Sequence, residues 1–417
     1  MRAVALWMAG LVVLSACGSS DSSEGGGGSA GTIDAATGGQ SSGGTSGSNS
    51  GGGGSGGTGT GGTATGGSST GGAAGQDGGV TPDGSAGAPA EAGVDAAPDA
   101  GKLTAQSCFD KMFPNASASA LGLDYDQFNP TIGSHCKGTN QQDIKGVQKV
   151  VFLGDSVTVG TPPTNLNPGA VYRAILANKL ATLFNIQPPG FGWGAADPIN
   201  GVALPHESGD FISCAKWGAR TDDLMQDNTQ VEDCIPPDKR NLHYLVIMTM
   251  GGNDIASITK AGGGSNPSKT IPELWQQTQT FVQLLRDTVE WLKNPANVPG
   301  GVDVVFANNY EFTDGTGETN ACVLAGLGGI EPWQDKQAQA DMVIWANEQY
   351  MKIATDTQSD MIFMLESFCG HGYKRDDPTG PCYRGPNTPL WFDTTCIHPN
   401  APGHAALADL FYETIAE

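Results

Sequence analysis

The sequence predicts an α/β fold in which helices cover both faces of a parallel β-sheet. Two observations lead to this prediction. From Lys149 onward, short apolar runs typical of strands alternate with amphipathic helical patterns, and such alternation is typical of a parallel sheet between two layers of helices. The most unusual residues directly follow predicted strands, where the sites of such sheets lie. We place this domain at residues 103–417.

The chain begins with a segment typical of export. The apolar run Ala3–Leu14 is too short to span a bilayer as a helix but fits the core of a signal peptide. The segment Leu14-Ser-Ala-Cys17 begins with the last residue of this run. It resembles the bacterial lipoprotein box, in which the cysteine becomes the lipidated first residue of the mature protein. We therefore expect residues 1–16 to be a lipoprotein signal peptide and Cys17 to anchor the protein in a membrane. Gly18 follows instead of a retention aspartate, which favours the outer membrane or the cell surface.

Residues 17–102 are predicted to be a lipidated cysteine followed by a disordered tether. Of the 62 glycines in the chain, 31 lie between Gly18 and Gly101, mostly among Ser, Thr and Ala. With almost no large apolar side chains, this segment cannot offset the entropy lost on ordering. A flexible coil of this length spans about 50 Å, so it would hold the domain away from the membrane.

Strands and helices of the domain are predicted from two different periodicities. Five short runs rich in β-branched and apolar residues are expected to be strands: Lys149–Leu153, Phe211–Ala215, His243–Met250, Val302–Ala307 and Met361–Leu365. Four longer segments with apolar residues at spacings of three and four are expected to be helices: Ala170–Phe184, Pro272–Lys293, Asp341–Ala354 and Pro402–Ile415. Residues 103–146 are expected to form a small extension held by a disulfide.

The cysteines favour a disulfide framework. Nine are present, and eight remain when Cys17 is set aside; in an exported protein, an even number favours disulfides. Sequence proximity predicts the pairs Cys108–Cys136, Cys214–Cys234 and Cys369–Cys382, which leaves Cys322 and Cys396 as the fourth. The cysteines are scattered, without the spacings of a zinc site, so we expect none among them. We also expect no other metal and no cofactor.

The charge of the chain limits its partners. The formal net charge is -22, and a surface of this sign repels phosphate backbones. We therefore do not expect a nucleic acid among the partners.

Four segments carry residues suited to catalysis. Ser156 follows the first predicted strand in Gly-Asp-Ser, Gly218 follows the second, Asn253 follows the third in Gly-Gly-Asn-Asp, and His398 precedes the last helix. A serine hydroxyl can attack a carbonyl, a histidine can accept and return its proton, and a glycine N–H or an asparagine amide can donate to an oxyanion. Each residue alone also has a structural explanation, as a helix cap, a turn or a packed side chain.

Together and in this order, Ser156, Gly218, Asn253 and His398 resemble the signature residues of the SGNH hydrolases, also called GDSL esterases and lipases. The resemblance extends from Lys149 to the C-terminus. It implies a flavodoxin-like, three-layer α/β/α fold and ester hydrolysis without a metal. It also implies that Ser156 is the nucleophile, that His398 is the base, and that the N–H groups of Ser156 and Gly218 and the Asn253 side chain form the oxyanion hole.

The sequence departs from the family at one position. The family usually has an aspartate three residues before the histidine, where this chain has Thr395; Asp393 lies five residues before it. Three arrangements are open: Asp393, a backbone carbonyl or another acid orients His398. We favour Asp393, which would fix the imidazole tautomer and stabilise the imidazolium.

The main hypothesis is a carboxylic ester hydrolase that forms an acyl-enzyme at Ser156. A long surface tether suits two kinds of ester substrate, an acylated carbohydrate such as an acetylated polysaccharide, and short-chain acyl esters or lipids. The alternative is a non-catalytic, carbohydrate-binding surface lipoprotein on an esterase-like scaffold, motivated by the missing aspartate. A metallophosphatase using Asp155 would need clustered histidines and acids, which the sequence does not offer.

Overall fold

The computed structural model describes residues 103–113, 121–227 and 229–417. The predicted signal peptide, Cys17 and the tether lie outside these residues. Within the described part of the chain, no helix has both the length and the apolar composition needed to cross a bilayer.

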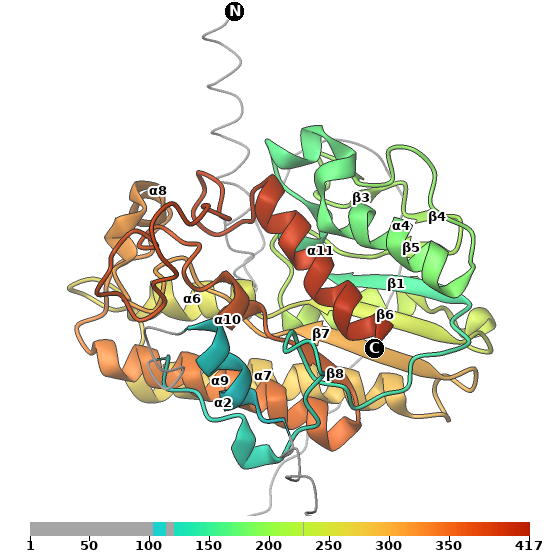
Figure 1. Cartoon of the computed structure of the whole chain (residues 1–417), viewed down its shortest axis with the longest axis horizontal. Coiled ribbons are helices and arrows are strands. Elements are labelled where there is room, and N and C mark those ends of the chain that lie inside the picture. The colour runs from blue at the N-terminus through green and yellow to red at the C-terminus, as the bar shows by residue number, and fades with distance from the viewer. Residues whose placement is uncertain (1–102, 114–120, 228) are drawn as a thin grey trace, which may run out of the picture. The chain divides into compact units, whose positions relative to one another are not determined.

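Six strands form one twisted sheet in the order β4-β5-β1-β6-β7-β8 (Figure 1). Their bounds are β1 Lys149–Gly154, β4 Glu207–Ser208, β5 Phe211–Ser213, β6 Tyr244–Thr249, β7 Val302–Ala307 and β8 Asp360–Ile362. The strands β5, β1, β6, β7 and β8 run parallel to one another, while β4 pairs antiparallel with β5 at the edge. Val150 of β1 lies between Phe211 of β5 and Leu245 of β6. The carboxyl ends of β5, β1 and β6 therefore lie next to one another.

Helices cover both faces of this sheet, as Figure 1 shows. The long helices are α4 Tyr172–Phe184, α7 Ile271–Lys293, α9 Lys336–Thr357 and α11 Ala401–Ala416. Because side chains alternate along a strand, Val151 and Leu153 of β1 belong to the core with α7 and α9. Val150 and Phe152 belong to the core with α4 and α11 on the opposite face. The three-layer α/β/α arrangement implied by the family resemblance is confirmed.

The remaining elements are short and lie mainly in the loops. The α-helices among them are α2 Ala105–Met112, α3 Ser156–Val159, α5 Gln230–Cys234, α6 Gly252–Gly262, α8 Val323–Leu327 and α10 Met364–Phe368. The 3-10 helices are η2 Asp126–Phe128, η3 Thr164–Leu166, η4 Pro168–Ala170, η5 Thr221–Leu224, η6 Pro237–Lys239 and η7 Thr319–Ala321. The strands β2 Ala195–Ala196 and β3 Ala203–Leu204 form a separate antiparallel pair.

One predicted element is wrong in its second half. The segment Met361–Leu365 was expected to be a strand, but β8 ends at Ile362 and α10 begins at Met364. Both elements are buried on all sides, and a short apolar run does not distinguish a buried strand from a buried helical turn. The helix expected from Asp341 also begins earlier, after Asp335, whose side chain caps its N-terminus.

All four predicted disulfides are present: Cys108–Cys136, Cys214–Cys234, Cys322–Cys396 and Cys369–Cys382. The first fixes the extension before β1, where Cys108 and Phe109 of α2 are buried in the α7–α9 core. The extension is therefore part of the same folded unit as the sheet.

Candidate active site

Ser156 is the first residue of α3, directly beyond the carboxyl end of β1. The sharp turn before it depends on Gly154, which has a φ of 141° and whose added Cβ would lie 2.4 Å from the Thr249 carbonyl oxygen. Only glycine fits this position. The side chain of Asp155 accepts a hydrogen bond from the Val157 N–H and so caps α3. Asp155, and not Ser156, is thus the capping residue, and the Ser156 hydroxyl has no part in the cap.

The buried side chain of Gln230 forms two hydrogen bonds with the backbone of Gly154. The Gly154 N–H donates to Gln230 Oε1 at 2.9 Å, and Gln230 Nε2 donates to the Gly154 carbonyl at 3.0 Å. Gln230 lies in α5 and is 2% exposed. This pair of hydrogen bonds fixes the peptide groups on which the position of Ser156 depends. Nothing in the sequence singled out Gln230, because its role depends on where α5 packs.

Ser156 and His398 are in direct contact. The Ser156 Oγ lies 2.8 Å from His398 Nε2, although the two residues are 242 positions apart in the chain. The relative exposure is 5% for Ser156 and 3% for His398. Burial lowers the pKa of His398 to about 4, so its imidazole is neutral at neutral pH and one ring nitrogen can accept a proton.

The loop that carries His398 is held at several points. The Asp393 N–H donates to the His398 carbonyl at 2.8 Å. Two tyrosine hydroxyls donate to its backbone, Tyr310 to the Ile397 carbonyl and Tyr373 to the Asp393 carbonyl, both at 2.6 Å. The disulfide of Cys396 adds a covalent link. Several constraints of this kind fix the imidazole relative to Ser156.

Thr395 lies between His398 and Asp393. The Thr395 Oγ1 is 2.8 Å from His398 Nδ1 and donates to Asp393 Oδ1 at 2.5 Å. The Thr395 N–H donates to the same carboxylate oxygen at 2.8 Å. The sequence predicted that the Asp393 carboxylate reaches the imidazole itself; in the structure, a threonine hydroxyl occupies that place. The reason is the position of Asp393 at the start of the turn, where its carboxylate folds back onto residue 395.

Burial also affects the charge of Asp393. Its side chain is largely buried, and burial raises the pKa of its carboxyl to about 6, against the opposite effect of the hydrogen bonds from Thr395. At neutral pH Asp393 is therefore a carboxylate. The Thr395 hydroxyl lies between this carboxylate and the neutral imidazole of His398.

Two of the predicted oxyanion donors, Gly218 and Asn253, lie on segments that contact each other. Gly218 follows β5 with a φ of 77°, and Asn253 is the second residue of α6, beyond β6. Asn253 Nδ2 donates one hydrogen bond to the Ala219 carbonyl at 2.9 Å. Since an amide nitrogen carries two hydrogens, one remains for another acceptor. The Lys216 N–H donates to the Gly154 carbonyl at 3.1 Å, which attaches the Gly218 loop to the end of β1.

A buried aspartate strengthens the contact between these loops. Asp254 accepts hydrogen bonds from the N–H and the hydroxyl of Thr221 at 3.2 and 3.1 Å. Burial raises its pKa to about 7. Asp254 thus connects the start of α6 to η5, three residues beyond Gly218.

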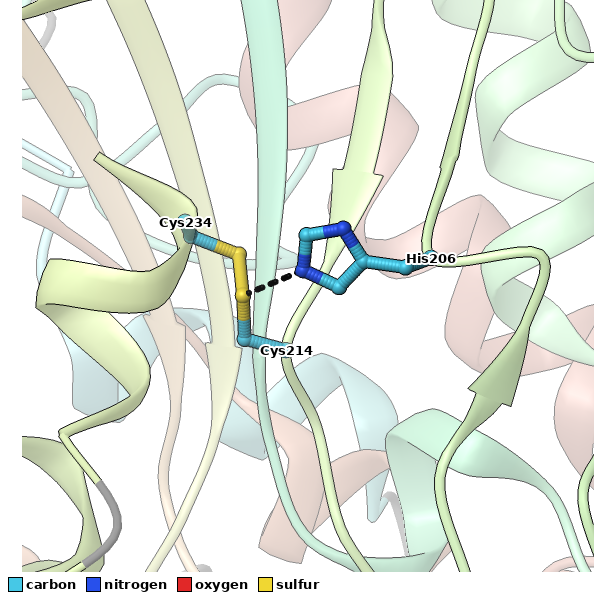
Figure 2. Close-up of side chains that lie close together, drawn as sticks. All are labelled: His206, Cys214 and Cys234. Carbon is cyan, nitrogen blue, oxygen red and sulfur yellow. Dashed lines mark hydrogen bonds between the residues drawn. A yellow bond between two sulfur atoms is a disulfide. The ribbon is translucent and has the colours of Figure 1, made fainter. Parts of the chain in front are cut away.

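Another group of polar side chains lies near the end of β5. His206 Nε2 lies 3.1 Å from the Cys214 sulfur. Figure 2 shows this contact and the disulfide that joins Cys214 to Cys234. In the described part of the chain, these three residues form the group whose possible ligand atoms lie close enough together, within 4.8 Å of one another, to hold a metal ion. Both sulfurs are used in the disulfide, so they do not offer thiolate ligands, and we assign no metal to this group.

The geometry combines a buried serine–histidine pair with two loops of amide donors at one edge of a parallel sheet. Residues 150–411 match the family model for the GDSL-like lipases and acylhydrolases. The chain belongs to this family. The predicted relationship to the SGNH or GDSL hydrolases is therefore confirmed, and the chain is a carboxylic ester hydrolase.

Solved structures similar to this GDSL hydrolase include two from Streptomyces. The extracellular lipase of Streptomyces rimosus is 17% identical, with 64% of this chain and 100% of that chain covered and a TM-score of 0.38. Phospholipase A1 of Streptomyces albidoflavus NA297 is 18% identical over 64% and 100% of the two chains, with a TM-score of 0.39. The acetylxylan esterase Axe2 of Geobacillus stearothermophilus is 16% identical over 66% and 97%, with a TM-score of 0.37. Among curated proteins, no match was found.

Proposed function

We propose that this GDSL hydrolase cleaves its esters by a serine mechanism with Ser156 as the nucleophile. The contact of 2.8 Å between Ser156 Oγ and His398 Nε2 carries the proposal. A neutral imidazole at this distance can take the hydroxyl proton as the oxygen attacks the ester carbonyl.

The reaction would proceed in two halves. In the first, Ser156 Oγ bonds to the carbonyl carbon, His398 Nε2 takes the serine proton, and the same nitrogen returns it to the departing alcohol, which leaves an acyl-enzyme. In the second, His398 takes a proton from water, the hydroxide attacks the acyl carbon, and the acid departs as Ser156 recovers its proton.

The oxyanion of each tetrahedral intermediate would be stabilised by three donors. They are the N–H groups of Ser156 and Gly218 and the second Nδ2 hydrogen of Asn253. The hydrogen bond between Asn253 and the Ala219 carbonyl supports this role, because it fixes the amide before the substrate arrives. Donors fixed in advance need no reorganisation when the charge develops, and losing one typically slows catalysis by about 10²–10³-fold.

The proposed substrates are acyl esters at the cell surface, either acetylated or otherwise acylated carbohydrates or short-chain lipid esters. The lipoprotein box at Cys17 and the long Gly-rich tether support this location. The net charge of -22 favours a neutral ester substrate over a strongly anionic one such as pectin. Hydrolysis rates for acyl chains of two to sixteen carbons, compared with acetyl release from xylan or pectin, separate these two substrate classes.

The test of the mechanism is the variant Ser156→Ala. It should lose hydrolysis of p-nitrophenyl acetate and butyrate while its circular dichroism spectrum is unchanged, and a fluorophosphonate probe should label the parent enzyme at Ser156 only. Full activity in the variant would overturn the serine mechanism. Absence of labelling together with polysaccharide binding would favour the alternative of a non-catalytic carbohydrate-binding protein.

A further inference from the structure

The hydroxyl of Thr395 is in contact with both a ring nitrogen of His398 and a carboxylate oxygen of Asp393. We propose that Thr395 is a positioning residue for catalysis, whose hydroxyl connects the Asp393 carboxylate to the His398 imidazole. The inference rests on the proposed roles of Ser156 and His398. It replaces the direct aspartate–histidine contact expected from the family pattern with a chain of three hydrogen bonds, from Ser156 through His398 and Thr395 to Asp393.

The direction of these hydrogen bonds follows from the number of protons available. A threonine hydroxyl has one proton to donate and two lone pairs that accept. The Thr395 hydroxyl donates its proton to Asp393 Oδ1, so towards His398 it can only accept. His398 Nδ1 must then carry the ring proton of the neutral imidazole. The unprotonated nitrogen is consequently Nε2, which faces the Ser156 hydroxyl at 2.8 Å, as a general base requires.

The orientation of the Thr395 side chain is fixed by its surroundings. Its N–H and its hydroxyl both donate to Asp393 Oδ1, at 2.8 and 2.5 Å, which closes a local turn around the carboxylate. Threonine is branched at Cβ and has few χ1 rotamers. The backbone on either side of it is held by Tyr373 at the Asp393 carbonyl and by Tyr310 at the Ile397 carbonyl.

The same chain conveys the charge of Asp393 to the imidazole. When His398 gains the serine proton, the imidazolium donates from Nδ1 to Thr395, whose hydroxyl is polarised by the carboxylate. Charge-assisted hydrogen bonds are stronger than neutral ones. The stabilisation acts through one intervening hydroxyl, so we expect it to be weaker than that of a carboxylate in direct contact.

A purely structural explanation exists for the same contacts. Aspartate side chains often hydrogen-bond the backbone two residues further on and thereby stabilise a turn. In that case the loss of the Thr395 hydroxyl would change stability, with kcat following only as far as the fold is disturbed. The two explanations differ in how substitutions at positions 393 and 395 combine.

The experiment compares kcat and KM for p-nitrophenyl butyrate in variants of the intact chain. Thr395→Val removes the hydroxyl at nearly constant shape and should lower kcat roughly 10- to 100-fold with KM within about twofold. Thr395→Ser keeps the hydroxyl and should retain most of the parent kcat. Thr394→Val makes the same chemical change at an exposed neighbour and should leave kcat unchanged.

Two combinations then test the connection itself. Asp393→Asn should lower kcat in the parent but have little further effect beside Thr395→Val, because the connection is already broken. In the double variant Asp393→Asn/Thr395→Asp, the exchange variant, a carboxylate lies next to His398 Nδ1. This variant should have a higher kcat than Asp393→Asn alone. Nitrogen chemical shifts of the His398 ring should report the Nδ1–H tautomer in the parent and a mixture in Thr395→Val.

The proposal is overturned if folded Thr395→Val keeps the parent kcat, or if the effects of the two single substitutions simply add. Should Thr395→Val not fold, the ring-nitrogen shifts of the parent decide, because a Thr395 hydroxyl that donates to Asp393 and accepts from His398 requires the ring proton on Nδ1; a ring proton on Nε2 overturns the proposal. Failure of the serine mechanism is recognised separately, by an active Ser156→Ala. An inactive Ser156→Ala with a fully active Thr395→Val contradicts the role of Thr395 alone.

Discussion

Cys322 and Cys396 are joined by a disulfide across 74 positions of sequence, and Cys396 lies two residues before His398. The segment that follows β7 is thereby bonded covalently to the loop that carries the proposed base. The Tyr310 hydroxyl, from the same segment, donates to the Ile397 carbonyl. The position of His398 thus depends on β7 as well as on the turn in which it lies.

Removing this disulfide should affect both stability and activity. With both cysteines replaced by alanine, loop-closure entropy predicts a loss of about 4.5 kcal/mol in the free energy of unfolding. The kcat should also be lower, because the His398 loop is released. The matched control is the corresponding change at Cys369–Cys382, whose separation is 13 residues and for which about 3 kcal/mol is expected. Urea unfolding and steady-state kinetics measure both. If the two double variants lose kcat equally, the disulfide of Cys396 has no particular role in positioning His398.

Asn253→Ala should impair catalysis far more than substrate binding. Loss of one oxyanion donor raises the barrier by about 2.7–4 kcal/mol, so kcat should fall roughly 10²–10³-fold while KM changes little. The substitution also removes the hydrogen bond to the Ala219 carbonyl, so its melting temperature is measured alongside. A parent-like kcat in the folded variant would show that Asn253 only connects the two loops.

The pH dependence of kcat/KM should depend on Asp393. Burial raises the pKa of its carboxyl to about 6, and the proposed role needs the carboxylate, so activity should fall as the pH drops through about 6. His398 must be neutral, and burial lowers its pKa to about 4, so its own protonation acts only at lower pH. In Asp393→Asn, kcat/KM should no longer fall near pH 6. Its maximum value should also be lower than that of the parent enzyme.

A control for this profile is provided by Asp155, because burial raises its pKa to about 7. Asp155 caps α3 and is unchanged in Asp393→Asn, so any step that it causes should remain in both enzymes. Identical profiles for the two enzymes would remove Asp393 from the explanation of the acid limb.

Gln230→Leu should destabilise the enzyme and displace Ser156. The substitution leaves the buried N–H of Gly154 without its Gln230 acceptor, and a buried unsatisfied donor costs about 1–3 kcal/mol. Because Gly154 sets the turn before the serine, labelling by a fluorophosphonate should slow as well. Urea unfolding and labelling rates measure the two effects. Unchanged labelling in a destabilised variant would limit Gln230 to a structural role.

Much of the fold was predictable because its signals are local. The apolar spacing over Pro272–Lys293 predicted a helix, and α7 spans Ile271–Lys293. The strand expected at Val302–Ala307 has those bounds in the structure. The helix α6 was not predicted, because the Gly251-Gly252-Asn253-Asp254 segment at its start is as typical of a turn as of a helix. Its helical conformation depends on packing against α7 in the core.

The site was predictable in part, for a similar reason. The place of Ser156 after the first strand and of His398 before the last helix, together with the family resemblance, indicated that they meet at one edge of the sheet. The role of Thr395 was not visible, because it depends on a rotamer and on where the Asp393 carboxylate lies. In the sequence, position 395 showed only that an aspartate was missing.

The distance along the chain between Ser156 and His398 has a consequence for biosynthesis. A ribosome must polymerise nearly the whole domain before the second of these side chains exists, and shorter translation products contain the serine without its partner. On the proposed mechanism, nascent and prematurely terminated polypeptides are chemically inert towards the acylated molecules of the cell that makes them. Reactivity then arises late, when chain elongation has passed residue 398 and the last loop has closed over the sheet.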